Sequence, residues 1–514
     1  MNIRHILFLF SFVIISIARG QGVDYSLSNE IKVWALEAPT DLINTKSNKK
    51  ILHTGAPNLN KIKSYWVDFT NPENPTREKF GTPFDKSYAK NFINLGNRIF
   101  WSLSVKDKKT KQLYDMLVEY DENGKLLEIM KIDSSDYSSY GELPYQRIRY
   151  SPDSSKVLMM NIADDNHKSD PFSIRAIVMD ANVKEISRYS IFDESKNSQK
   201  MRDVTDCQVA NDGSFTIVER RFIDKPKESR KVGKKKVANY HLSIIDVDKD
   251  GKATVDDLES TGGFFDACRI FKFRNGTQML AYAKRGKRDD SSIKGFDFFI
   301  KKPTDVKYEV IEYLFSQEEI DKYGKWDKRD PGFVGHSIVQ PQYQKEGDDK
   351  IYFLLEKSNF INKKQGDLLI QHHVLGSSLI VEIDSDANII NTTLIPKYSE
   401  NQFYQSQSLI LKYKGKTALL YTDLNTNEDR KIKDYKKFHK VKMFRGSYVS
   451  EIIAYEDDSG SLIREKIEDI KKLFTYKQFA HTDAKGRVVV PATKKANLVK
   501  RNLLFITIEN SEMN

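Results

Sequence analysis

Apolar and polar residues alternate in short runs along most of the chain, and polar turns separate the runs. Cys207–Val218 is typical, because one alternating run leads into Asn211-Asp212-Gly213 and a second run follows. Strict alternation predicts β-strands with one buried face. Asn-Gly or Asp-Gly between two such runs predicts a hairpin, since glycine adopts a positive φ without steric cost. The pattern therefore predicts an all-β protein built from hairpins.

The hairpins recur in a larger unit that reads strand, polar turn, strand, loop, strand, tight turn, strand. Like elements return roughly every 45 to 65 residues, the spacing of four-stranded propeller blades with some long loops. We therefore expect a single β-propeller of seven or eight four-stranded blades, near residues 31–75, 88–133, 139–192, 201–259, 264–314, 333–395, 402–465 and 473–510. A strand near Ile31–Leu36 is expected to complete the last blade and close the ring.

One turn carries a resemblance to a known repeat. Tyr150-Ser151-Pro152-Asp153-Ser154-Ser155-Lys156-Val157 resembles the TolB-type (PD40, WD40-like) propeller repeat, which often reads aromatic-Ser-Pro-Asp-Gly-Lys before a strand. Ser154 stands where that repeat usually has glycine, and the other units keep the turn but lose Ser-Pro-Asp. The resemblance implies the propeller fold and no particular function, because such propellers serve as scaffolds and as enzymes.

The first twenty residues predict export. Arg4 and His5 precede the apolar run Ile6–Ala18, and Ala18-Arg19-Gly20 supplies small residues before Gln21. That order is typical of a secretory signal peptide. The alternative is a retained membrane anchor, but the run of about 13 residues is short of the roughly 20 that span a bilayer. We therefore expect a signal peptide over 1–20 and one propeller domain over 21–514, located in the periplasm, at the cell surface or secreted.

The net charge of +11 predicts a polyanionic or acidic partner. Export argues against nucleic acid and favours another envelope protein, an anionic glycan or lipopolysaccharide. In a propeller the middle loops of the blades share one face and the hairpin turns share the other. The basic residues fall in the expected middle loops, at Arg220–Lys236, Lys284–Arg288, Lys106–Lys111, Lys494-Lys495 and Lys500-Arg501. The alternative is a lysine-rich solvated surface that binds no partner.

Two cysteines, Cys207 and Cys268, follow the signal segment. In an oxidising compartment they could pair. The alternative is two buried free thiols.

Asp246–Gly251 is the best candidate for a metal site. It places carboxylates at positions 1, 3 and 5 and glycine at position 6, as a calcium loop requires. Position 12 is Asp257 instead of glutamate, and the flanks predict strands instead of helices. We therefore expect a polar hairpin turn, with calcium as the weaker alternative and no other cofactor.

No other motif supports a catalytic, cofactor or metal site. Gly335-His336-Ser337 lacks the second glycine and the strand–turn–helix context of a nucleophile elbow. His372 and His373 are adjacent in an expected strand, so they point to opposite faces and do not share a metal readily.

The expected function is therefore a non-catalytic, exported binding or scaffold propeller of the cell envelope, docking an anionic or acidic partner on a basic face. The alternative is a propeller-fold polysaccharide lyase or hydrolase that acts on an anionic glycan. A lyase would bring histidine, tyrosine and arginine together at one site.

Overall fold

The computed structural model describes the chain in segments. They are residues 25–27, 31–34, 38–44, 49–55, 63–68, 76–80, 83–84, 87–95, 98–107, 109–121, 124–136, 145–162, 172–193, 201–258, 263–273, 275–285, 292–316, 318, 333–334, 350–365, 368–397, 399–401, 408–424, 441–442, 449–467, 473–475, 477, 480–482, 487–494, 500–509 and 511–513. The predicted signal segment and Gly335-His336-Ser337 lie outside them.

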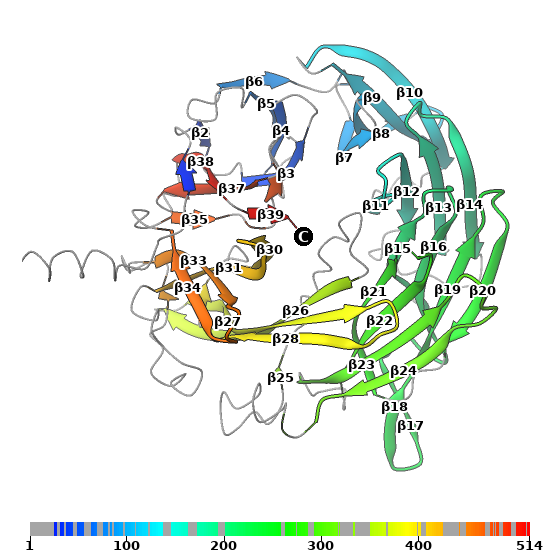
Figure 1. Cartoon of the computed structure of the whole chain (residues 1–514). Coiled ribbons are helices and arrows are strands. Elements are labelled where there is room, and N and C mark those ends of the chain that lie inside the picture. The colour runs from blue at the N-terminus through cyan, green and yellow to red at the C-terminus, as the bar shows by residue number, and fades with distance from the viewer. Residues whose placement is uncertain are drawn as a thin grey trace, which may run out of the picture.

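Within these segments, eight sheets of four or more strands, antiparallel except for one short parallel pair, follow one another around a ring, and we number them as blades 1 to 8 (Figure 1). Blade 1 holds β3 (Ala38–Asn44), β4 (Lys49–Gly55), β5 (Lys63–Asp68) and β6 (Thr76–Phe80). Blade 2 holds β7 (Ser87–Leu95), β8 (Arg98–Asp107), β9 (Gln112–Tyr120) and β10 (Leu126–Asp136). Blade 3 holds β11 (Tyr145–Tyr150), β12 (Lys156–Ile162), β13 (Phe172–Asp180) and β14 (Glu185–Asp193). Blade 4 holds β15 (Arg202–Val209), β16 (Phe215–Phe222), β19 (Tyr240–Val247) and β20 (Ala253–Leu258).

The remaining blades carry additional short strands. Blade 5 holds β21 (Phe264–Lys272), β22 (Gln278–Arg285), β23 (Ser292–Lys301) and β24 (Glu309–Leu314), with β25 (Phe333–Val334) paired to β23. Blade 6 holds β26 (Lys350–Gln365), β27 (Leu368–Asp384), β28 (Ile389–Ile395), β29 (Ser399–Asn401) and β32 (Val441–Lys442). Blade 7 holds β30 (Leu409–Tyr413), β31 (Lys416–Leu424), β33 (Val449–Glu456), β34 (Leu462–Lys466) and β39 (Ser511–Met513). Blade 8 holds β35 (Leu473–Thr475), β36 (His481–Thr482), β37 (Val488–Lys494) and β38 (Lys500–Ile508), together with β1 (Tyr25–Leu27) and β2 (Ile31–Trp34).

The expected all-β propeller is therefore confirmed, with eight blades. Its hydrophobic cores lie between neighbouring sheets, because alternate residues of one strand face opposite neighbours. On β19, Ile245 and Val247 pack in the cluster shared with blade 3, and Ile244 packs in the cluster shared with blade 5. The fourth strands are largely exposed, as on β24, so the first strands lie toward the centre of the ring (Figure 1).

The ring closes through the N-terminal segment. β1 and β2 both pair antiparallel with β38, and in β2 the register joins Ile31 to Leu503 and Trp34 to Lys500. This confirms that a strand near Ile31 completes the last blade. The first expected unit, 31–75, was placed too early, because β2 belongs to blade 8 and blade 1 runs from β3 to β6.

Aspartate builds the second hairpin turn of several blades. In blades 3, 4, 6 and 7 the carboxylate of the first turn residue accepts the backbone N–H groups two and four positions later, at Asp180, Asp248, Asp384 and Asp457. A short acceptor side chain at this position replaces the strand hydrogen bonds that a tight turn removes.

Glycine at position 295, on β23, is required by close packing against β24. A Cβ atom there would lie 1.9 Å from the carbonyl oxygen of Tyr313 and 2.9 Å from Cα of Leu314. Both neighbours are backbone, so no side-chain movement could make room for it.

The largest expected basic loop forms a separate hairpin. Between β16 and β19 the chain forms β17 (Ser229–Val232) and β18 (Lys235–Ala238), which project from the ring (Figure 1). Lys231, Lys234 and Lys235 are exposed on it. Lys284, assigned to another basic loop, is instead buried at 7% side-chain exposure, where it pairs with Asp297 and Glu312. Lys284 therefore does not contribute to the expected basic face.

Both cysteines are buried and free. Cys207 lies in the cluster between blades 3 and 4 and Cys268 in the cluster between blades 4 and 5. Burial raises the pKa of each thiol to about 12.

The described segments contain no helix with the length and apolar character needed to cross a bilayer.

Candidate functional site

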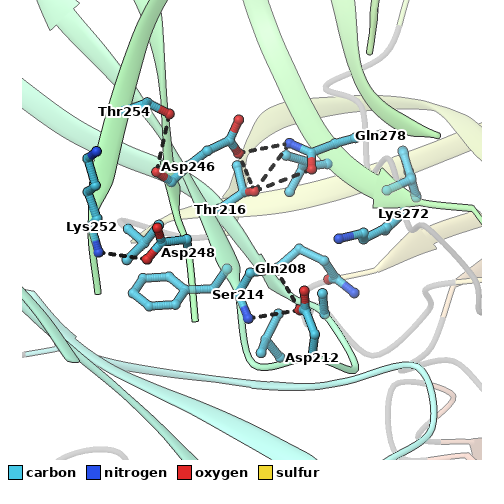
Figure 2. A pocket seen from close by; sticks show the side chains of 16 residues that line it. Gln208, Asp212, Ser214, Thr216, Asp246, Asp248, Lys252, Thr254, Lys272 and Gln278 are labelled. Carbon is cyan, nitrogen blue, oxygen red and sulfur yellow. Dashed lines mark hydrogen bonds between the residues drawn. The ribbon is translucent and has the colours of Figure 1, made fainter. Parts of the chain in front are cut away.

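A pocket of about 450 Å³ lies between blades 4 and 5, at the end of the sheets where the hairpin turns lie. Blade 4 contributes β15, β16, β19 and their turns, and blade 5 contributes β21 and the start of β22 (Figure 2). Its polar lining consists of Gln208, Asp212, Ser214, Thr216, Asp246, Asp248, Lys252, Thr254, Lys272 and Gln278. Apolar residues such as Val209, Phe215 and Ile270 complete the wall. A concave site with a few converging polar groups is the usual form of a small-molecule site.

Asp246 is the most firmly held carboxylate in this pocket. It is two residues beyond Ile244 on β19, so its side chain also points toward blade 5. Thr216, its partner across the strands, donates its hydroxyl to Oδ1 at 2.6 Å, and the Gln278 amide donates to the same oxygen at 3.2 Å (Figure 2). These bonds fix the carboxylate at the boundary of the two blades.

Blade 5 also supplies a charge for Asp246. The ammonium of Lys301 lies 3.3 Å from Oδ2, and the hydroxyl of Tyr308 donates to Oδ2 at 3.4 Å. Burial, with the nearby negative charge of Asp246, raises the pKa of Tyr308 far above its usual value. Tyr308 is therefore a neutral donor at any physiological pH.

Lys272 provides the opposite charge. It follows Ile270 by two residues on β21, so it points toward blade 4, and its ammonium enters the pocket (Figure 2). Among the described residues, Lys272 has no hydrogen-bond or ion-pair partner. A half-buried ammonium that forms no direct ion pair with a described residue favours an anionic group from a ligand.

Asp212, in the turn after β15, is the second acidic group in the wall. Burial alone would raise its pKa, but the hydrogen bonds from the hydroxyl and backbone N–H of Ser214 and the charge of Lys272 lower it overall. Asp212 therefore stays ionised in the neutral range.

The expected calcium motif contributes two residues to this pocket. Asp246 faces Thr216 and Lys301, whereas the Asp248 carboxylate accepts the backbone N–H groups of Asp250 and Lys252. The expected hairpin turn is confirmed. Within the described segments, no group of three or more histidine, cysteine or acidic residues is arranged to hold a metal ion. Calcium binding at this turn stays a prediction.

The other candidates from the sequence lie elsewhere. His372 and His373 are adjacent on the long strand β27 of blade 6. The basic β17–β18 hairpin leaves blade 4 at the far end of β16, so it lies on the opposite face from the pocket. Residue spacing gave no signal for Lys272 or Gln278, because their role arises only when blades 4 and 5 come together.

No protein-family model and no curated protein matches the chain. Solved structures of similar fold include the propeller domain of the Trilobed protease from Pyrococcus furiosus, at 12% identity and a TM-score of 0.36, covering 84% of this chain and 96% of that one. The acylaminoacyl peptidase of Pyrococcus horikoshii matches at 11% identity and 0.36, covering 83% of this chain and 52% of its own. Prolyl oligopeptidase B from Galerina marginata matches at 8% identity and 0.37, covering 89% and 55%. This chain thus spans about half the length of the two peptidases.

These neighbours correct the expected function. A non-catalytic scaffold was the main expectation, whereas the propellers found belong to peptidases, which are hydrolases. The chain is an all-β protein whose fold is similar to that of peptidase β-propeller domains.

Proposed function

We propose that this chain is a hydrolase that acts on an anionic glycan and that the pocket between blades 4 and 5 binds the substrate. The observation that carries the proposal is the placement of a fixed carboxylate, Asp246, and an unpartnered ammonium, Lys272, in the same pocket. Lys272 pairs with the acidic group of the sugar, and Asp246 serves the reacting centre.

The chemistry follows from the carboxylates in the wall. Glycoside hydrolysis uses a pair of carboxyl groups beside the scissile bond, one as base or nucleophile and one as proton donor. Asp246 is held by Thr216, Gln278 and Lys301, which suits a base that accepts a proton from water or stabilises positive charge at the sugar carbon. Asp212 is held ionised, so it suits substrate binding through sugar hydroxyl groups.

The proposal also includes two predictions made from the sequence, namely export and a TolB-type propeller repeat. The signal-like segment 1–20 supports an exported enzyme, for which an acidic envelope or extracellular glycan is the partner. The turn at Ser151–Lys156 supports a TolB-type repeat. The backbone N–H of Ser151 donates to the Lys156 carbonyl at 3.0 Å, and Ser154 has a φ of 56°, a conformation that glycine adopts most readily.

The test is an activity screen of the full chain on uronate-containing and sulfated polysaccharides, with new reducing ends as the readout. Asp246→Asn preserves the size of the side chain and should lower kcat by at least about 100-fold. Lys272→Met should raise KM for acidic substrates. Asp458→Asn is the control, because Asp458 is 92% exposed in a turn of blade 7.

Asp248→Asn, measured in parallel, tests whether Asp248 donates the proton, and Asp212→Asn tests the role of Asp212 in substrate binding. Cleavage that yields an unsaturated sugar would identify a lyase and overturn hydrolysis. Full activity of Asp246→Asn, or the absence of new reducing ends with every substrate, would contradict the proposal.

A further inference from the structure

The two-stranded hairpin of blade 4, formed by β17 and β18, projects from the ring (Figure 1). A two-residue turn at Gly233 and Lys234 joins the strands, and their register pairs Val232 with Lys235. Gly233 has a φ of 60°, as a hairpin turn with glycine at its first central position requires. A Cβ atom placed at Gly233 would have nothing within 4 Å beyond its chain neighbours. The tip of the hairpin is therefore free of packing contacts at this position.

The base of the hairpin is fastened to blade 4 by Asn239, which is buried at 2% exposure. Its carbonyl oxygen accepts the backbone N–H of Ile223 at 2.9 Å, and its own backbone N–H donates to the carbonyl oxygen of Glu228 at 3.0 Å. Its side-chain amide donates to the carbonyl oxygen of Lys225 at 2.8 Å. These bonds hold the hairpin in a defined direction relative to the blade.

Beyond its base, the hairpin carries only positive charge. The charged residues between Ser229 and Ala238 are Arg230, Lys231, Lys234, Lys235 and Lys236. The first four of these are exposed, and their side chains make no ion pair or hydrogen bond within the part of the chain that the structure describes. Glu228, the acid that precedes them, lies at the base, 3.7 Å from Arg220. The exposed cations therefore favour a partner that brings negative charge.

The exposed cations lie on both faces of the two-stranded ribbon. Successive residues of a strand point to opposite faces, and residues in register share a face. Arg230, Val232 and Lys235 therefore lie on one face, and Lys231 lies on the other. A linear anionic polymer that runs along the ribbon covers one face, whereas the headgroups of a bilayer surround a ribbon that meets the bilayer with its tip.

The tip also presents an apolar side chain. Val232 is the last residue of β17 and is 54% exposed. An exposed valine gains nothing from a polyanion dissolved in water. At a membrane surface, by contrast, apolar side chains enter the boundary between headgroups and acyl chains, and basic residues pair with anionic headgroups. The combination of valine and cations at the tip therefore favours a lipid surface over a soluble polymer.

We propose that the β17–β18 hairpin docks the chain on a bilayer that contains anionic phospholipids. Val232 enters the headgroup region, and the four exposed cations contact the phosphates around it. Because the hairpin and the pocket lie on opposite faces of the ring, the docked chain turns its pocket away from the bilayer. This docking does not rest on the proposed hydrolase activity, because no residue of the hairpin lines the pocket.

The test is flotation of the full chain with vesicles of phosphatidylcholine that contain about 30% phosphatidylglycerol. Vesicles of phosphatidylcholine alone measure binding that needs no anionic lipid, including any by the apolar run Ile6–Ala18. A hairpin variant replaces the four exposed cations, as Arg230→Gln, Lys231→Gln, Lys234→Gln and Lys235→Gln. It should lower the partition coefficient on anionic vesicles at least about 100-fold, because each basic residue near such a surface contributes roughly fivefold. Val232→Ser should lower it about threefold.

The matched control removes four exposed lysines from the hairpin turns on the pocket face, as Lys125→Gln, Lys184→Gln, Lys249→Gln and Lys307→Gln. This variant has the same net charge as the hairpin variant but should keep most of the vesicle binding. A second variant, Lys231→Arg with Lys234→Arg and Lys235→Arg, keeps the charge of the hairpin and should bind like the parent. Salt at about 0.5 M should release the parent, because it screens the attraction between surface charges.

Two results would overturn the docking. They are full binding of the hairpin variant to anionic vesicles, and an equal loss of binding by the matched control. Tight binding to soluble heparin, together with no effect of Val232→Ser on anionic vesicles, would assign the hairpin to a dissolved polyanion and overturn the membrane partner. Hydrolysis of a soluble substrate should be unchanged in the hairpin variant, so a failure of the docking and a failure of the hydrolase are distinguishable.

Discussion

The ammonium of Lys477 in blade 8 lies 2.8 Å from Oε2 of Glu451 on β33 of blade 7, and both side chains are 1% exposed. Lys477 also donates to the hydroxyl groups of Thr422 and Thr475, at 2.8 and 2.7 Å. Those hydroxyl groups donate in turn to Oε1 of Glu451 at 2.8 Å. A polar network without access to water thus joins the last two blades.

Lys477→Met should destabilise the protein by about 3–5 kcal/mol, because it leaves the Glu451 carboxylate buried without a countercharge. Denaturant unfolding measures the change. The double variant Lys477→Met/Glu451→Leu should recover much of the loss, since it removes both charges. Lys302→Ala is the control, because its pair with Asp386 is exposed at 51% and 59% and an exposed pair contributes little to stability. If Lys477→Met loses no more stability than the control variant, the Lys477–Glu451 pair is exposed to water in solution.

A second buried pair predicts a pH dependence. Burial would raise the pKa of Glu356, but the charge of Lys397 and hydrogen bonds from Lys397, Ser408 and Ser378 lower it overall. In the unfolded chain Glu356 takes up a proton near its ordinary pKa of 4.5, whereas in the folded chain it does so only at lower pH. Its contribution to stability is therefore present above about pH 4.5 and is lost as the pH falls through the folded value.

Glu356→Gln should accordingly be less stable than the parent at pH 7, and the difference should narrow as the pH falls below about 4.5. Thermal unfolding of both proteins across that range measures it. A difference that stays constant with pH would show that Glu356 has the same pKa in both states.

The burial of both cysteines predicts that they react slowly with thiol reagents. Cys207 and Cys268 are buried, with pKa values raised to about 12, so the native protein contains almost no thiolate at pH 8. Titration with a thiol reagent should detect no reaction in the native state and two thiols per chain in denaturant without reductant. If no thiols react in denaturant, Cys207 and Cys268 form a disulfide, the pairing that an oxidising compartment would allow.

Gly295→Ala should cost about 3 kcal/mol, because the new methyl group would collide with the backbone of β24. The control is Gly460→Ala, where nothing lies within 4 Å but φ is 74°, so that only backbone strain of about 1 kcal/mol is expected. Denaturant unfolding compares the stability of the two variants. Equal losses of stability would show that β23 and β24 move apart to admit the methyl group without a free-energy cost.

The blades could be predicted from the sequence because their signals are local. Alternation defines each strand, and Asp-Gly or Asn-Gly marks the turns, as at Gly213 and Gly251 with φ values of 91° and 80°. These residues need no partner from another blade to adopt their conformation. The closing strand near Ile31 was also predicted, and β2 pairs with β38 as expected.

The pocket could not be predicted, because its geometry depends on the contact of two blades. Asp246 was singled out for its spacing to Asp248 and Asp250, yet its contacts are Gln278 and Lys301, 32 and 55 residues away. The prediction for Lys284 was wrong for the same reason. It was assigned to the surface because it stands in a basic run, but it is buried and pairs with Asp297 and Glu312.

The pairing of β2 with β38 has a consequence for the order of events during synthesis. Ile31 is synthesised long before its partner Leu503. At a typical rate of about 5–20 residues per second, β2 waits for tens of seconds to more than a minute without its sheet. During that time blades 1 to 7 can pack in sequence while the ring stays open. The edge of β2 must then be kept from pairing with other chains, and we expect slow translation to favour aggregation over closure.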